Sequence, residues 1–433
     1  MADGSLTTMD RSDRLLMIGP DHQALEAIQE HDVEVTVLAG GSSKDIGLPI
    51  PSGRTTVLFT DDHKNVDNAL NCLYRHGAEH FDAVYAHDDP AMMTAAVLGQ
   101  VLGARAVPPK VVALFRDKYQ QKQALRQAGI EVARHELIED IRDLPPGYEL
   151  PFARAVVKPV AGQATQSTFL VSSTSEVYRI SRDCRAKAMP SRTFVVEEFV
   201  EGEEWFADGV VSGGRVRFAS LGRYAKNCLT AVNERTPVRT FCLDPIADKA
   251  SYNVAMPVVH QALSTLGLID GVFHMELFYD GSRIAFSECA ARRAGGPISD
   301  QIRYKFGVDL AALSVLCHLR AVDDIAATPR DGVVGSAFLP LAEGTLLDHP
   351  SVADLLAQPD VVNARIFVPK GLRTAPAGGN TFGRLGEFTV HTKSWEETTR
   401  RLDEVSAWFT TNLKVLPLTA TMRELRKLSL LGG

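Results

Sequence analysis

The chain has 433 residues, which allows about two to four domains, and its 45% hydrophobic and 23% charged residues are ordinary for a globular protein. Its formal net charge of −7 argues against a general nucleic-acid-binding protein, because no broad basic face is available to phosphates. No apolar run approaches the roughly 20 residues that a membrane-spanning helix needs, so we expect no membrane partner.

The cysteines and the N-terminal segment indicate a cytoplasmic protein. The six cysteines are scattered singly, with no CxxC pair and no histidine cluster at zinc spacing, which favours reduced and mostly buried thiols. Residues 1–13 are polar and lack the apolar core of a signal peptide, so we expect a disordered leader there.

Apolar strands alternate with helices from residue 14 to residue 112. This order predicts an α/β fold that begins with a doubly wound parallel sheet. The first strand is followed by GPDHQA instead of GxGxxG, which argues against a nicotinamide-dependent dehydrogenase. We expect strands over residues 14–18, 33–41, 55–59 and 82–87, and helices over residues 24–31, 67–74 and 90–103.

The pattern changes after residue 112. A single helix is expected over residues 113–129, ended by Gly129. Lys158 lies inside an apolar strand over residues 154–160, where a lysine is costly unless it has an anionic partner. Further along we expect strands over residues 168–173 and 193–202, helices over 175–187 and 251–267, a hairpin over 205–222 that turns at 212–214, a linker over 326–332 and a C-terminal helix near 395–413.

A second hairpin, VFHMELFY and SRIAFSE around Asp280-Gly281, carries two acids. A two-residue turn would place Glu276 and Glu288 on opposite faces. A three-residue loop would pair Tyr279 with Arg283 and place both acids on one face as diagonal neighbours, roughly 7 Å apart. Two acids that close repel each other unless a cation lies between them, and Mg²⁺ suits two carboxylates plus phosphate oxygens. Either glutamate alone is more often a solvated strand residue.

Basic and flexible residues follow this hairpin in the stretch FSECAARRAGG. Arg292-Arg293 forms a local basic spot that could hold a small anion. Gly295 and Gly296 would let backbone N–H groups approach such an anion. A helix is expected over residues 297–307, and its N-terminal dipole would favour the same negative charge.

The order of these features resembles the ATP-grasp superfamily, in particular its carboxylate–amine ligases of the amino-acid or peptide type. The features are Lys118, Lys158-Pro159 with a small-residue loop, the hinge VVEEFVEGEE, and then the two acids ahead of Arg292. The resemblance covers roughly residues 14–320. After the leader (1–13), it implies an N-terminal Rossmann-like domain (14–112), an ATP-grasp domain (113–325) with a lid lobe around residues 120–195, and a C-terminal α+β domain (326–433).

The resemblance also implies roles for individual residues, with ATP and Mg²⁺ as cofactors. Arg292 would steady the transferring phosphoryl group and the intermediate, act with Lys158 as a catalytic group, and bind substrate together with Gly295 and Gly296. The implied nucleotide and metal contacts are Lys118 and Lys158 at the phosphates, Glu197, Glu198 and the backbone of Val200 at the adenine, Glu204 at the ribose, and Glu276 and Glu288 at Mg²⁺.

The chain departs from the family pattern at two places. The phosphate loop of the family often reads KPxxGxGSxG, but here Ala164 and Ser167 occupy later glycine positions and Thr165 stands in the serine place. Many relatives carry an Asn two residues after the second acid, and here that residue is Ala290. One metal ligand is therefore missing, which leaves the number of Mg²⁺ ions open.

The implied reaction forms an amide through an acylphosphate and releases ADP and phosphate. The partners would be a small-molecule carboxylate and an amine, with amino acids as the implied class, and a homodimer is compatible with the family. Three alternatives stay open: an ATP-grasp enzyme of the purine-synthesis or biotin-carboxylase type, a non-catalytic ATP-binding protein, and a dehydrogenase. The bases that carry no assigned role and could hold a substrate carboxylate are Arg223, Lys226 and Arg303.

Overall fold

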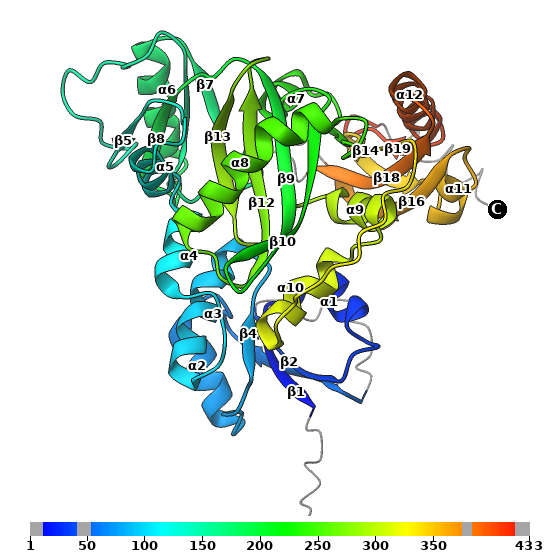
Figure 1. The fold of residues 1–433 in the computed structure, drawn as a ribbon. Coiled ribbons are helices and arrows are strands. Elements are labelled where there is room, and N and C mark those ends of the chain that lie inside the picture. Colours follow the sequence, from blue (N-terminus) through cyan, green and yellow to red (C-terminus); the bar gives the residue numbers. More distant parts are fainter. Residues whose placement is uncertain (1–11, 41–52, 375–382, 421–433) are drawn as a thin grey trace, which may run out of the picture.

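A parallel sheet forms the N-terminal part of the computed structural model, which describes residues 12–40, 53–374 and 383–420 (Figure 1). The strand order is β3-β2-β1-β4, so the predicted doubly wound parallel arrangement is confirmed. The predicted leader lies outside the described residues except for its last two positions. The elements are β1 (Asp13–Ile18), α1 (His22–Ala27), β2 (Val33–Gly40), β3 (Thr55–Thr60), α2 (Val66–Arg75), β4 (Ala83–Tyr85) and α3 (Asp89–Leu102).

The predicted helix over residues 113–129 is wrong, because two helices share this stretch. Helix α4 (Pro109–Arg116) ends at Asp117, whose backbone is extended with φ −90° and ψ 100°. The Asp117 side chain accepts a hydrogen bond from the backbone N–H of Gln120 and so caps α5 (Lys118–Gln127). The break places Lys118 in the first turn of α5, with Lys122 one turn later on the same face.

A small antiparallel sheet with the strand order β5-β8-β6-β7 covers the region predicted as a lid lobe. It has its own hydrophobic cluster, in which Val157, Phe194 and Val196 are fully buried beneath a helix. Figure 1 shows this sheet as a lobe set apart from the larger sheet. Its elements are β5 (His135–Ile138), β6 (Ala155–Pro159), β7 (Phe169–Val171), α6 (Thr174–Ala186) and β8 (Phe194–Glu198).

The largest sheet is antiparallel, with the strand order β13-β12-β9-β10-β11-β14-β18-β16. It continues across the predicted boundary at residue 326, because β14 pairs with β11 on one side and with β18 on the other. The division of the chain into domains therefore stays a prediction. The strands are β9 (Glu203–Ser212), β10 (Arg215–Tyr224), β11 (Arg239–Cys242), β12 (Gly271–Tyr279), β13 (Ile284–Ala290), β14 (Val333–Pro340), β16 (Val361–Ile366) and β18 (Arg384–Thr392).

Helices pack the N-terminal parallel sheet against the largest antiparallel sheet. The first cluster of buried apolar side chains runs from Leu16 in the parallel sheet to Met275 in β12, and Val315 belongs to a second cluster that reaches Leu15. Figure 1 shows α10 between the two sheets. The remaining elements are α7 (Cys228–Glu234), α8 (Lys249–Leu266), α9 (Ile298–Phe306), α10 (Leu310–Leu319), α11 (Val352–Leu356), α12 (Trp395–Thr411), β15 (Gly344–Asp348), β17 (Arg373–Thr374) and β19 (Lys414–Leu416).

Both registers predicted for the β12–β13 hairpin are wrong. Tyr279 pairs with Ile284, so residues 280–283 form the loop, and a bulge at Ser287 shifts the register again before Glu288. Glu276 consequently stands directly opposite Glu288, and opposite residues of an antiparallel pair share a face. The expectation that both acids project from one side is met, by a closer pairing than the predicted diagonal.

Two general expectations can be compared with the described residues. All six cysteines are free and buried, as the sequence predicts. Within residues 12–40, 53–374 and 383–420, no helix combines the length and the apolar character that crossing a membrane requires.

Candidate functional site

A cavity of about 430 Å³ collects most of the residues that the sequence singled out. Residues from the small sheet, the β9–β13 part of the large sheet and the N-terminal region all line it. Gly296 is not among the lining residues, although its neighbour Gly295 is. The predicted residues that line the cavity are Lys118, Lys158, Glu197, Glu198, Val200, Glu204, Glu276, Glu288, Arg292 and Gly295.

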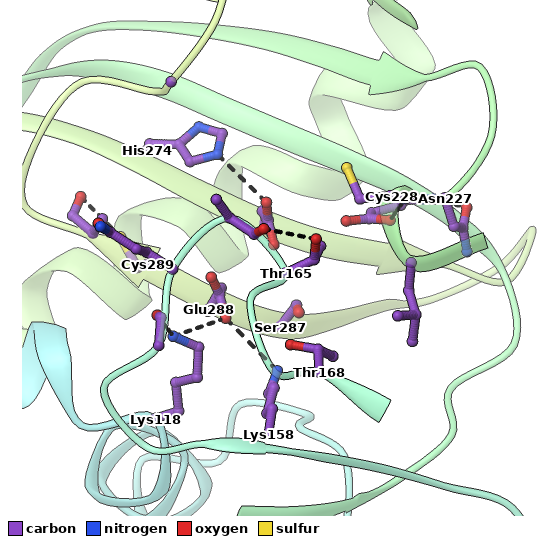
Figure 2. Close-up of a pocket in the computed structure, with 18 of the residues that line it drawn as sticks. Lys118, Lys158, Thr165, Thr168, Asn227, Cys228, His274, Ser287, Glu288 and Cys289 are labelled. Carbon is purple, nitrogen blue, oxygen red and sulfur yellow. Dashed lines mark hydrogen bonds and ion pairs between the residues drawn. The ribbon is translucent and has the colours of Figure 1, made fainter. Parts of the chain in front are cut away.

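The acidic pair Glu276 and Glu288 is held by cations at the cavity wall. The Glu288 carboxylate lies 3.3 Å from Lys118 Nζ and 3.6 Å from Lys158 Nζ, and Figure 2 shows both lysines converging on it. Burial alone would raise the pKa of Glu288, but Lys118 and Lys158 lower it to about 2. Glu276 lies 3.6 Å from the ring Nε2 of His274. The arrangement keeps the Glu288 carboxylate ionised directly opposite the Glu276 side chain.

His274 and Asp208 support Glu276, and the sequence analysis missed both. His274 Nδ1 lies 3.1 Å from Asp208, whose side chain is fully buried. Burial would lower the pKa of His274, but Asp208 and Glu276 raise it to about 10, so the ring is protonated. For His274 the available signal was its position in the strand, because a residue two places before Glu276 faces the same side of the sheet.

A third lysine, Lys122, was also missed. It is fully buried, its Nζ lies 2.9 Å from Glu197, and it donates a short hydrogen bond to the carbonyl of Ser287 at the β13 bulge. Burial lowers the pKa of Lys122 to about 8 even though Glu197 opposes the shift. The signal in the sequence was its spacing of four residues from Lys118, which puts both on one helix face.

Glu197 serves two buried lysines. Its carboxylate lies 2.9 Å from Lys122 and 3.1 Å from Lys158. Burial alone would lower the pKa of Lys158, but Glu197 and Glu288 raise it, so this lysine stays charged inside the apolar strand. The anionic partner that the sequence required for Lys158 is therefore present. This use of the Glu197 side chain differs from the adenine contact that the resemblance implies.

The other hinge residues lie at the cavity in different ways. The Glu198 carboxylate accepts a 2.7 Å hydrogen bond from Arg134 at the surface. The Glu204 carboxylate is buried and accepts a 2.7 Å hydrogen bond from the backbone N–H of Cys228. Burial and the Glu276 charge raise the pKa of Glu204 to about 8. Glu204 is thus a poorly solvated acid that a hydroxyl group could stabilise by donating a hydrogen bond.

The loop after Lys158 adopts the backbone that glycines favour, without glycines. Ala164, Thr165 and Ser167 have φ values of 53°, 55° and 57°. A left-handed backbone is costly for a residue with a Cβ, most of all for a β-branched one. The loop is tied to the lysine cluster because Lys118 Nζ donates a 2.6 Å hydrogen bond to the carbonyl of Gly162. The sequence departure from the family pattern therefore gives a strained loop.

The two arginines of the stretch FSECAARRAGG have separate partners. Arg292 lines the cavity and donates a 2.6 Å hydrogen bond to Asp89 at the start of α3. Arg293 is fully buried, forms a short ion pair with Asp21 and donates a 2.7 Å hydrogen bond to Gln23. The expectation that both arginines form an anion-binding spot is wrong for Arg293, which instead joins the segment after β13 to the start of α1.

The glycine pair and the helix after it lie at the same end of the cavity. A Cβ added to Gly295 would meet no atom within 4 Å, so this backbone is open toward the cavity. Gly296 has φ +75°, and an added Cβ would lie 2.8 Å from the Phe338 ring. Pro297 and Ile298 at the N-terminus of α9 line the cavity, as expected. The bases left without an assigned role, Arg223, Lys226 and Arg303, are not among its lining residues.

The arrangement suits a polyanionic ligand. Lysines and Arg292 supply positive charge, the acid pair offers oxygen ligands for a hard cation, and the open glycine backbone offers N–H groups. A triphosphate with its metal matches this combination better than a neutral or cationic ligand does.

Comparisons with known proteins agree with this chemistry. Residues 153–301 match the family model of an ATP-grasp domain. The L-arginine-specific L-amino acid ligase of Bacillus subtilis is 22% identical over 298 residues, which are 67% of this chain and 70% of that protein. Human carnosine synthase 1 is 25% identical over 64% of this chain, a match that spans only 36% of that longer protein.

A solved structure shares the fold over nearly the whole length. The L-amino acid ligase from Bacillus licheniformis superposes with a TM-score of 0.75 at 19% identity, over 94% of this chain and 100% of that one. The matched domain, the relatives and the shared fold lead to one assignment. The chain contains an ATP-grasp domain over residues 153–301 and is similar to ATP-grasp ligases that form C–N bonds.

Proposed function

We propose that this enzyme joins the carboxylate of one amino acid to the amine of another, with ATP and Mg²⁺, through an acylphosphate intermediate. Relatives named as an L-amino acid ligase and a carnosine synthase support amino acids as the substrate class. The single observation that carries the proposal is the pairing of Glu276 with Glu288 in one cavity with Lys118, Lys158 and Arg292.

The donor set fits Mg²⁺. Two carboxylates stand directly opposite each other, and carboxylate oxygens are hard ligands that this ion accepts. Among the described residues no group of three acidic, histidine or cysteine side chains could hold a metal, so phosphate oxygens and water would complete the coordination. Ala290 supplies no ligand, which favours a single tightly held ion. When bound, the ion would neutralise charge on the phosphoryl oxygens.

The side chains of the chain itself would do the rest. Lys118 and Lys158 would leave Glu288 to contact the phosphates, and Arg292 would hold the substrate carboxylate in line with the γ-phosphate. A carboxylate oxygen attacks the γ-phosphorus, and the bond to ADP breaks. The amine then attacks the acyl carbon, phosphate leaves, and the amide remains after the amine loses a proton.

The nucleotide end and the lid belong to the same proposal. Glu204 would accept a hydrogen bond from a ribose hydroxyl, while Glu198 and the backbone of Val200 would lie at the adenine. The β5–β8 lobe with its loop after Lys158 would cover the phosphates and exclude water, which protects an acylphosphate from hydrolysis. The domain boundaries, the cytoplasmic location and the assembly state stay predictions.

A screen of amino-acid pairs tests the function. Purified protein with ATP and Mg²⁺ should release ADP and phosphate in equal amounts with at least one pair, and mass spectrometry should find the amide product. Phosphate release that requires bicarbonate or formate instead would favour the purine or biotin-carboxylase alternative. ATP binding without turnover under every condition would favour the non-catalytic alternative.

A further inference from the structure

Asp89 has no role in the reaction outlined above, although it lines the cavity wall. It begins α3 in the N-terminal region and reaches Arg292 at the end of β13, with 2.6 Å between carboxylate and guanidinium. Both side chains are mostly buried, at 18% and 17% exposure, yet both border the cavity. The pair is therefore shielded from solvent but accessible to a ligand.

The neighbouring acid is engaged elsewhere. Asp88 forms a 3.0 Å ion pair with Lys64 and is 38% exposed. Burial alone would raise the pKa of Asp89, but Arg292 lowers it, so this acid is ionised. Burial lowers the pKa of His87 beside it to about 4, so that ring is neutral. At this end of the cavity Asp89 is thus an ionised acid whose ion-pair partner is Arg292, a proposed substrate-binding residue.

An Arg–Asp pair is the electrostatic complement of an amino-acid zwitterion. The guanidinium can take the α-carboxylate in a bidentate contact, and the carboxylate can take the α-ammonium. Exchanging the internal pair for a zwitterion leaves the net charge of the site unchanged, so no uncompensated charge is buried. A simple carboxylic acid would take Arg292 and leave Asp89 without its hydrogen-bonded ion-pair partner, with only the weaker influence of Lys118 and Arg116 remaining, which is unfavourable at 18% exposure.

We propose that Asp89 binds the α-ammonium of the amino acid whose carboxylate is activated, while Arg292 binds that carboxylate. This inference rests on the proposed function and deepens it by naming the acyl-donor subsite. It places that subsite between the N-terminal region and β13, with Gly295 open beside it.

The assignment has a chemical consequence. An ammonium held by a carboxylate keeps its proton and has no lone pair with which to attack an acylphosphate. The donor amino acid is thereby protected from reacting through its own amine, and the acceptor must bring its free amine from another part of the cavity. By holding the ammonium of one amino acid in its protonated form, Asp89 would determine which of the two amino acids contributes the acyl group.

The first test needs no variant. An amino-acid amide has no free carboxylate, so it can act only as the acceptor. With one such acceptor fixed, ADP formation is measured for a donor α-amino acid and for the 2-hydroxy acid of the same side chain. We expect kcat/KM to favour the amino acid by at least about 10-fold, because the hydroxy acid leaves the buried Asp89 unpaired. Equal use of both donors would overturn the inference.

The second test compares two Asp→Asn variants. Asp89→Asn should raise KM for the donor amino acid by about 10- to 100-fold and remove the preference over the hydroxy acid, with KM for ATP changed less than about threefold. Asp32→Asn is the matched control, because Asp32 pairs with Arg54 at the same 2.6 Å but at the surface, with 60% exposure. It should change neither parameter.

The outcomes separate this inference from the proposed function. If ADP forms with amino-acid pairs but Asp89→Asn retains the wild-type donor preference and KM, the subsite assignment is wrong and the ligase function stands. If no amino-acid pair supports ADP formation, the proposed function fails and the subsite falls with it. Circular dichroism and ATP binding by Asp89→Asn establish that the variant is folded, and the donor comparison on the wild type decides the question if it is not.

Discussion

The substitution Glu288→Gln tests the centre of the proposed site. Glutamine keeps the shape of the side chain but removes the charge that faces Lys118 at 3.3 Å and Lys158 at 3.6 Å. It also removes one of the two carboxylates proposed to hold Mg²⁺. Charge neutralisation by a bound ion contributes several kcal/mol to phosphoryl transfer, so kcat should fall by about 1000-fold or more.

The cost to stability can be worked from the same contacts. The fall in the pKa of Glu288 from 4.5 to about 2 corresponds to about 3 kcal/mol of preference for the ionised form. Solvent reaches the side chain, which is 30% exposed, and Glu276 directly opposite loses a like-charged neighbour. We therefore expect a net loss of about 1–2 kcal/mol in the free energy of unfolding, which leaves the protein folded.

The assay measures ADP formation and urea unfolding of both proteins at pH 7. That pH is correct for the comparison, because a carboxyl whose folded pKa is lowered stabilises the protein above pH 4.5 and loses that effect as the pH falls toward 2. Glu131→Gln is the control, since Glu131 is 52% exposed and lies 3.8 Å from Arg283 at the surface. Wild-type turnover by folded Glu288→Gln would refute the metal-site reasoning.

Two further substitutions test the buried ion pairs. Asp21→Asn leaves the fully buried Arg293 without its acid and should lower the free energy of unfolding at pH 7 by about 3–5 kcal/mol. Burial would raise the pKa of Asp21, but its surroundings, Arg293 among them, lower it from 3.8 to about 2. The difference in thermal unfolding temperature between wild type and Asp21→Asn should therefore become smaller as the pH falls from 4 toward 2, because Asp21 loses its charge over that range. A difference that stays constant over this range would contradict the prediction. Lys122→Met removes the ion pair with Glu197 and the hydrogen bond to the carbonyl of Ser287. Urea unfolding should show a loss of about 2–3 kcal/mol in the free energy of unfolding, and KM for ATP should rise. An unchanged KM for ATP would mean that Lys122 does not position Lys118 and Lys158.

Local sequence pattern predicted most elements because their signals are local. Period-2 and period-3.6 hydrophobicity, glycine stops and turn residues operate over a few positions, and the parallel N-terminal sheet follows from the alternation of strands and helices. The broken helix at Asp117 also had a local signal, since Asp is a common N-cap, and its side chain does cap α5. The prediction of one continuous helix over residues 113–129 overlooked this capping signal at Asp117.

The sequence by itself determined the order of lysines, hinge, acids and arginine, and with it the resemblance to ATP-grasp ligases and most of the candidate residues that line the cavity. Only the tertiary structure decided how they are used, because the deciding contacts join residues far apart in the chain. Lys122 bonds across 165 positions to the carbonyl at the β13 bulge, and Arg292 and Arg293 reach across 203 and 272 positions to Asp89 and Asp21. Local sequence patterns describe only neighbouring residues, so they cannot predict pairings over such distances. Burial matters too, because an exposed ion pair contributes little, whereas a buried one fixes the charge and the position of both side chains.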